Sequence, residues 1–203
     1  MVGGGDLTLY RGTKIKASDT ACGIYTVAGE PGIYNKSKIT VDNSTIKAIN
    51  NAAIIVNRRE TNVDTVNKTD IILQNDSKVS SGNGIGLLIN NSYIGKNGTM
   101  TFNSKTTSDR VFPDKMIIHG NSLGNTNIAI NNIGGTSDAH LNRLELIHVD
   151  GSSNAVFNQS GRIVAGAYNY SLVRGRGRNA GNWYLSSQPT LNDPEARGIR
   201  SLG

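Results

Sequence analysis

Cysteine is nearly absent from this 203-residue chain, which contains only Cys22. A lone cysteine cannot close an internal disulfide, so Cys22 is either a free thiol or pairs with a residue outside the chain. Long hydrophobic runs are also absent, and no stretch of about 18 apolar residues could cross a membrane as a helix. The opening MVGGG lacks the basic start and apolar centre of a signal peptide and is typical of an initiator added to a mature fragment.

Aromatic residues make up only 5% of the chain, whereas there are 24 Gly and 25 Asn. Gly and Asn weaken helix interiors and suit turns, while the plentiful Ile, Val and Thr favour strands. No 11-residue window shows a convincing 3.6-residue periodicity. The sequence therefore predicts an all-β fold, and its length allows a substantial hydrophobic core.

The net charge of +6 is moderate, and its source changes along the chain. All lysines lie at or before Lys115, whereas the basic charge towards the C-terminus comes from arginine alone. A positive surface attracts anionic partners such as nucleic acid, glycosaminoglycans or lipid headgroups. Solubility alone also explains a charge of this size, so both interpretations stay open.

An internal repeat gives the strongest indication of the fold. The segments 38–56 (KITVDNSTIKAINNAAIIV) and 70–89 (DIILQNDSKVSSGNGIGLLI) share a pattern of short strands and small-residue turns, about 32 residues apart, with one extra residue in the second copy. A fainter third copy begins near 97–102. Each copy presents apolar residues that only a stacked neighbour can bury. The pattern predicts a β-solenoid, with Asn ladders at its repeated turns.

Two polar segments, 57–69 and 104–113, interrupt the repeat and are expected to project from the rod as loops. Loops on a rigid scaffold are where binding usually resides, so these two are the candidate binding loops. We place the solenoid coils in 1–113. The last coil of a solenoid exposes a sheet edge and needs a cap.

The stretch 114–188 supplies that cap, because its apolar and polar residues alternate more cleanly than those upstream. GAYNYSLV and NWYLS are expected to be paired strands, joined by the arginine-glycine run 174–178. For Arg174, Arg176 and Arg178 we favour a glycine-permitted turn. Contact with an anionic host glycan or receptor is the first alternative, and nucleic acid the second.

The C-terminal part resembles the passenger region of pertactin-like and AIDA-type autotransporters, the type V secreted proteins of Gram-negative bacteria. The residues that carry the resemblance form strand and turn motifs in a fixed order: Ile118, Gly120, Gly124 and Thr126; Ile128, Ile130, Asn132, Gly134 and Gly135; Leu144, Leu146, Ile147, Val149 and Gly151; the run Phe157 to Leu172; and Trp183, Tyr184 and Leu185.

The resemblance implies a right-handed parallel β-helix with a hairpin-like C-terminal cap that is the autochaperone region. It also implies an export signal before the chain and an outer-membrane β-barrel after it, with 189–203 beginning the linker. The residues it assigns to folding and capping are Gly161, Gly166, Tyr168, Tyr170, Leu172, Trp183, Tyr184 and Leu185.

No enzymatic motif is convincing. Ser122 lies in a G-x-S-x-G sequence, but no helix pattern follows it and no partnered histidine is evident. His119, His140 and His148 lack metal-ligand spacing. We therefore expect no catalytic residue, no cofactor and no metal. A glycan-cleaving β-helix would need clustered carboxylates, and the set Asp42, Asp64, Asp70 and Asp76 suits solvated turns better.

The sequence and the resemblance together predict a secreted or surface-displayed virulence factor. It would bind host cells, through a receptor or a glycosaminoglycan, as a released effector or an adhesin. Two alternatives remain: a fragment whose only role is folding and display, or an adhesin for bacterial self-association. The chain itself is expected to be a monomer that does not bind nucleic acid.

Overall fold

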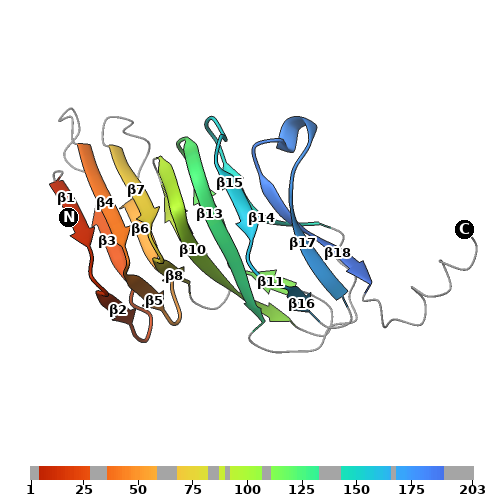
Figure 1. The fold of residues 1–203 in the computed structure, drawn as a ribbon, viewed down its shortest axis with the longest axis horizontal. Helices are drawn as coiled ribbons and strands as arrows, with labels where there is room; N and C mark the ends of the chain where they lie inside the picture. Colours follow the sequence, from red (N-terminus) through yellow and green to blue (C-terminus); the bar gives the residue numbers. More distant parts are fainter. Residues whose placement is uncertain are drawn as a thin grey trace, which may run out of the picture.

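The computed structural model describes residues 5–27, 36–58, 68–81, 87–89, 92–106, 111–132, 143–165 and 168–189. These residues form eighteen strands and one short 3-10 helix, η1 (Gly177–Asn179). Most strands run parallel to their neighbours, and Figure 1 shows them side by side along a rod. Among the described residues there is no helix with the length and hydropathy to cross a membrane. The predicted all-β solenoid is confirmed.

The first three coils contain three strands each: β1 (Gly5–Leu9), β2 (Lys14–Ala17) and β3 (Ile24–Val27); β4 (Lys36–Asp42), β5 (Thr45–Ala48) and β6 (Ile54–Arg58); β7 (Lys68–Gln74), β8 (Lys78–Ser80) and β9 (Leu87–Ile89). Each strand pairs in parallel with the equivalent strand of the next coil. At the corner between the first two strands, Asn43 and Asn75 adopt positive φ values of 43° and 44°, which asparagine tolerates well.

Further along the rod the chain forms β10 (Tyr93–Thr106), β11 (Val111–Pro113), β12 (Met116–Ile118), β13 (Ser122–Asn132), β14 (Leu144–Val149) and β15 (Val156–Gln159), of which β10 and β13 are the longest. The long strand β10 stacks on both β7 and β8, with a register shift beside Asn97, and β13 stacks on β10. The chain then changes to antiparallel pairing in β16 (Ile163–Ala165), β17 (Tyr168–Arg174) and β18 (Trp183–Pro189). We call β16, β17, η1 and β18 the cap.

The strand register confirms the repeat. Lys38 pairs with Asp70, 32 residues on, and Ile46 pairs with Val79, 33 residues on, because the second copy carries one extra residue at the corner. The repeat extends one coil further towards the N-terminus than the copies seen in the sequence, since β1 to β3 stack on β4 to β6 in the same way. The third copy begins earlier than expected, at Tyr93.

Three other expectations need correction. The expected loop 104–113 is partly a hairpin, because Ser104–Thr106 belong to β10 and pair antiparallel with β11. Of the other expected loop, 57–69, the ends are strands and residues 59–67 lie outside the described residues. At the stacked corners, Asn75 Nδ2 donates to Asp42 Oδ1 at 2.8 Å, so this contact is an Asn–Asp pair in place of an amide ladder.

The hydrophobic core runs the length of the rod. Inward side chains such as Ile39, Ile71 and Met100 are fully buried, and residues from both sides of position 113 belong to one continuous cluster. The core reaches the cap through three aromatic rings. Tyr93 stacks on Phe157 with ring centroids 6.1 Å apart, and Phe157 meets Trp183 edge-on at 5.5 Å. The cap therefore shares the core of the coils.

Candidate functional site at the junction of coil and cap

Strand β14 is the point where the solenoid changes its pairing. On one side it pairs in parallel with β12, and on the other it pairs antiparallel with β18 of the cap. A register shift lies between Glu145 and Ile147, and the two neighbours Leu146 and Ile147 are both buried. This bulge changes which later residues of β14 face outward.

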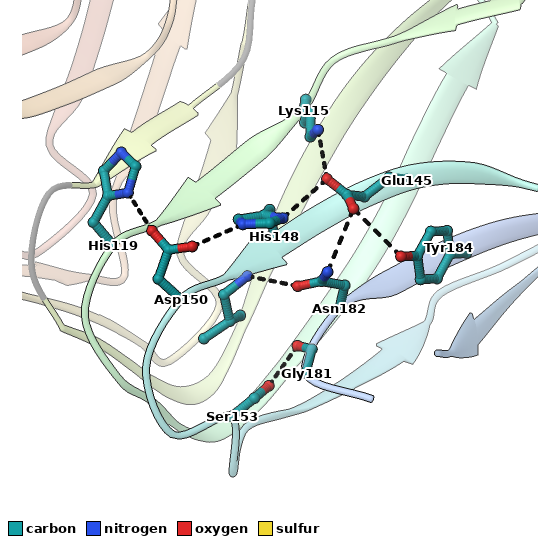
Figure 2. Close-up of polar contacts among 10 residues, drawn as sticks. Lys115, His119, Glu145, His148, Asp150, Ser153, Gly181, Asn182 and Tyr184 are labelled. Carbon is teal, nitrogen blue, oxygen red and sulfur yellow. Dashed lines mark hydrogen bonds and ion pairs between the residues drawn. The ribbon is translucent and has the colours of Figure 1, made fainter. Parts of the chain in front are cut away.

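Glu145 is the centre of a polar network that joins three segments (Figure 2). Its carboxylate is 2.5 Å from Lys115 Nζ, which precedes β12, and accepts hydrogen bonds from Asn182 Nδ2 at 3.4 Å and Tyr184 Oη at 3.3 Å, which belong to the last part of the cap. Burial alone would raise the pKa of Glu145, but the hydrogen bond and charge of Lys115, with smaller contributions from His148 and Tyr184, outweigh it and lower the pKa.

His148 extends the network along β14. Its Nδ1 lies 3.2 Å from Glu145 Oε1 and its Nε2 lies 2.8 Å from Asp150 Oδ1. His148 thus lies between two carboxylates on the same strand. Asp150 also contacts His119 Nδ1 at 2.6 Å, and this hydrogen bond is the main reason why the pKa of Asp150 lies below its ordinary value.

Two further contacts fasten the cap to the last coil (Figure 2). Asn182 Oδ1 accepts a hydrogen bond from the backbone N–H of Val149 at 3.0 Å, and Ser153 Oγ donates to the carbonyl of Gly181 at 2.7 Å. Asn182 thus uses its oxygen for the backbone of β14 and its nitrogen for Glu145. The cap is positioned by specific polar contacts as well as by the core.

The arginine-glycine run forms the turn between β17 and β18, as predicted. Gly175 is buried, and a Cβ there would lie 2.0 Å from the carbonyl oxygen of Asn179. Gly177 has a positive φ of 59° at the start of η1. Both positions therefore require glycine for structural reasons, one because of space and the other because of backbone conformation.

The three arginines proposed for an anionic partner differ in their surroundings. Arg174 Nε donates to the carbonyl of Ala180 at 2.7 Å, its Nη2 donates to the carbonyl of Ser153, and its guanidinium lies over the Trp183 ring. Arg174 therefore holds the turn in place. Arg176 and Arg178 are exposed, and their side chains make no ion pair or hydrogen bond with another described residue. Contact with an anionic partner stays a prediction, and these two residues are the ones free to make it.

The residues expected to fold the cap lie in or beside it, apart from Gly166, which lies outside the described residues. The side chains of Tyr170, Trp183 and Leu185 are buried, while Tyr168 and Leu172 pack against the core from its edge. Tyr184 points to Glu145, and Gly161 is exposed before β16. The expected pairing of the segments on either side of the arginine-glycine run is confirmed from Tyr168 onward, since β17 and β18 form an antiparallel pair.

Two other chemical candidates, Ser122 and Cys22, make no hydrogen bond to Glu145, His148 or Asp150. Ser122 is buried, with its hydroxyl 3.5 Å from that of Ser153 and in contact with the backbone N–H of Ala155. His140 lies outside the described residues. In the described part of the chain, no group of three or more His, Cys, Asp and Glu could hold a metal ion. Cys22 is half-buried, its thiol donates to the carbonyl of Ile24, and burial raises its pKa.

Sequence reasoning missed the network itself. Glu145 and His148 are three residues apart, and strict strand alternation places such residues on opposite faces of a sheet. They share a face here because the bulge at Leu146 adds one residue. Nothing in the local sequence marks that bulge, so only the paired structure could reveal it.

The fold and the junction define a class: a parallel β-solenoid closed by an antiparallel hairpin cap. The chain belongs to the family described as Autochaperone Domain Type 1, whose family model matches residues 61–172, more than half of the chain. The family and the named relatives identify the chain as part of an autotransporter passenger, in agreement with the resemblance described above.

Three relatives show the extent of the similarity. The uncharacterized protein YuaQ of Escherichia coli strain K12 is 47% identical over 119 residues, which cover 58% of this chain and 8% of YuaQ. The autotransporter adhesin AIDA-I of Escherichia coli is 30% identical over 122 residues, or 59% of this chain and 9% of AIDA-I. The BmaC autotransporter adhesin of Brucella suis biovar 1 is 32% identical over 119 residues, or 54% of this chain and 3% of BmaC. The chain thus spans less than a tenth of each.

Proposed function

We propose that the cap and the last coil act as the folding template of a passenger that is exported to the surface of a Gram-negative bacterium. The observation that carries this proposal is the double pairing of β14, which β18 holds on one side while its other edge pairs in parallel with β12. Before β12 has formed, a β14 strand that is already paired with β18 offers its other edge, and the coil that contains β12 can form on that edge.

Loop closure explains why the cap would form first. Strands β17 and β18 are joined by a short turn, so their pairing closes a short loop. Each parallel pair in the coils joins residues about 30 positions apart, for example Lys38 and Asp70. Short loops cost less conformational entropy to close, and local contacts form faster. The antiparallel cap therefore precedes the parallel coils and gives them a register.

The refolding kinetics of the full chain test this order. Trp183→Phe weakens the cap. Its loss of stability should appear almost entirely as a slower refolding rate, with little change in the unfolding rate. A variant of the second coil, Val41→Ala, should mainly speed unfolding. Both positions are buried, so both changes are large enough to measure. The opposite assignment, with Val41→Ala slowing refolding and Trp183→Phe affecting only unfolding, would reject the template role.

The displayed passenger is proposed to bind host cells as a non-enzymatic adhesin or effector. Two relatives, AIDA-I and BmaC, are named adhesins, which supports this role. The exposed arginines Arg176 and Arg178 at the tip of the cap suit an anionic glycan or an acidic receptor surface. The alternative that the chain serves only folding and display predicts no binding at all.

Binding of the purified chain to cultured human cells, titrated with salt and soluble heparin, tests this second role. Saturable binding that resists both would indicate a protein receptor, and binding abolished by either would indicate a charge-driven glycan contact. The double variant Arg176→Ala/Arg178→Ala should weaken a glycan contact. Lys16→Ala/Lys47→Ala removes the same charge from two exposed, paired positions of β2 and β5 and serves as the control.

A further inference from the structure

The outer face of strands β1, β4, β7, β10 and β13 carries an ordered row of side chains. The strand register aligns Thr8, Thr40, Ile72, Ile94 and Leu123 directly across the five strands. Residues next to them in each strand, such as Ile39, Ile71 and Tyr93, are fully buried, so the row faces outward. Figure 1 shows these strands side by side. We call this set the outer row.

The outer row is apolar at its C-terminal end and exposed to solvent. Leu123 is 46% exposed, and Val156 of the neighbouring strand β15 is 42% exposed. Val156 is aligned with Asn125 on β13, which follows the corner residue Gly124 and aligns with Lys96 of the neighbouring strand, so Val156 lies at the edge of this face. Tyr10, at the end of β1, is 54% exposed. Half of the six exposed large hydrophobic residues of the described chain thus lie on or at the edge of this face.

Charged rows flank the outer row on both sides. On one side, Asp6, Lys38 and Asp70 are aligned and alternate in sign. On the other side, Asp42 aligns with Gln74, which aligns with Lys96. The Asp42 carboxylate accepts a hydrogen bond from Asn75 and makes no ion pair with a described residue. The face therefore has an apolar centre between two differently charged borders.

We propose that this face binds a second copy of the chain, with the two rods side by side and pointing the same way. A two-fold axis along the outer row brings the row of one copy onto that of the other, so that Ile72, Ile94 and Leu123 meet their equivalents. The same axis brings one border of each copy onto the opposite border of the other. Lys38 then faces Asp42 of the second copy, and the pair occurs twice, as in any isologous interface.

The charges also select the direction of the rods. If the second rod ran the opposite way about Ile72, Asp42 would face Lys96 of the other copy, but Asp70 would face Asp70 and the apolar Ile94 would face Thr40. In the proposed arrangement Asp70 faces the neutral Gln74, and no like charges meet. Opposed like charges are costly at an interface, so the parallel arrangement is favoured. The alignment of these rows across five strands is the reason to propose a dimer in place of the expected monomer.

Sedimentation velocity of the full chain, from about 1 µM to about 1 mM, tests the proposal. A row that crosses five strands is roughly 20 Å long, and such a small patch suits a weak dimer that forms with rising concentration. Leu123→Lys should abolish the dimer, while Val164→Lys, at an exposed position of β16 outside this face, should leave it intact. A monomer at every concentration, or a dimer that survives Leu123→Lys, would overturn the proposal.

A charge exchange tests the partner and the direction together. Lys38→Asp should weaken the dimer at least tenfold, and the double variant Lys38→Asp/Asp42→Lys should restore it. Asp42→Lys should also weaken the dimer. If Asp42→Lys/Lys96→Asp then restores it, the rods run in opposite directions and the parallel arrangement is overturned. In a Cys22→Ser background, Thr40→Cys should also be joined to itself by a short bis-maleimide, and Lys47→Cys, on the other arm of the sheet, should not.

Discussion

Asn182 of the cap accepts a hydrogen bond from the backbone N–H of Val149, the last residue of β14, at 3.0 Å. Both residues are buried, so water does not readily reach the Val149 N–H to accept its hydrogen bond in place of Asn182. The same side chain donates to Glu145, so one asparagine satisfies the backbone of the last coil and joins its polar network. The cap therefore recognises β14 through its backbone, which is what a folding template needs.

Replacing Asn182 should destabilise the fold although no apolar contact is lost. Asn182→Ala leaves the N–H of Val149 buried without an acceptor, which costs about 1–3 kcal/mol. Asn179→Ala, three residues away on exposed η1, should change the free energy of unfolding by less than about 0.5 kcal/mol. Urea unfolding of both variants measures the two changes in the free energy of unfolding. Equal changes would show that the hydrogen bond to Val149 does not stabilise the fold measurably.

The two glycines of the arginine run should respond differently to substitution. Gly175→Ala places a Cβ 2.0 Å from the Asn179 carbonyl and 2.8 Å from the Tyr184 ring, so the turn must shift. We expect a cost of about 1–3 kcal/mol, as for other overpacked sites. Gly177 has open space but a positive φ, so Gly177→Ala should cost roughly 1 kcal/mol and Gly177→Asn less. Thermal unfolding of the three variants tests this interpretation, which is wrong if Gly175→Ala lowers the unfolding midpoint least.

The three arginines should separate into a structural residue and two surface residues. Arg174→Ala removes two hydrogen bonds to carbonyls and the contact with Trp183, for a loss of about 1–3 kcal/mol in stability. Arg174→Lys should restore only part of it, because an ammonium group lacks the planar fork. Arg176→Ala and Arg178→Ala should leave the unfolding midpoint in urea unchanged. A midpoint lowered as much by Arg176→Ala as by Arg174→Ala would refute the distinction.

The junction should lose stability in acid. The folded chain lowers the pKa of Glu145 and of Asp150 below their ordinary values of 4.5 and 3.8. A carboxylate whose pKa is lowered in the folded chain stabilises the fold at every pH above its ordinary pKa. This stabilisation disappears as the pH falls through the folded-state pKa. Because Asp150 is nearly half exposed, solvent and salt reduce its share.

Thermal unfolding midpoints between pH 3 and pH 7 measure this effect. The variant Glu145→Gln/Asp150→Asn should start from a lower midpoint at pH 7 and lose less of it below about pH 5 than the parent chain. Asp6→Asn/Asp76→Asn, at two exposed positions of early coils, gives a control with the same change in charge. If all three curves fall in parallel, the carboxylates of the junction do not determine the acid sensitivity.

Several elements could be predicted because their cause is local or periodic. The 32-residue repeat gave the register of Lys38 on Asp70, and the extra residue in the second copy lies at the corner, where the structure shows it. Alternation gave the β17–β18 pair. The pairing of β10 with β11 was missed because its first strand, Ser104–Thr106, is polar and charged, and polarity alone does not distinguish a loop from a strand.

The sequence by itself determined the class of fold, the repeat, the paired strands of the cap and the turn at Arg174 to Arg178, since each follows from residue type and spacing within a short stretch. Only the tertiary structure decided which side chains meet. The bulge at Leu146 puts Glu145 and His148 on one face, and the stacking of five coils aligns Ile72 with Leu123. Such contacts depend on backbone pairing between distant segments, and a one-residue shift in that pairing would turn every one of these side chains to the other face.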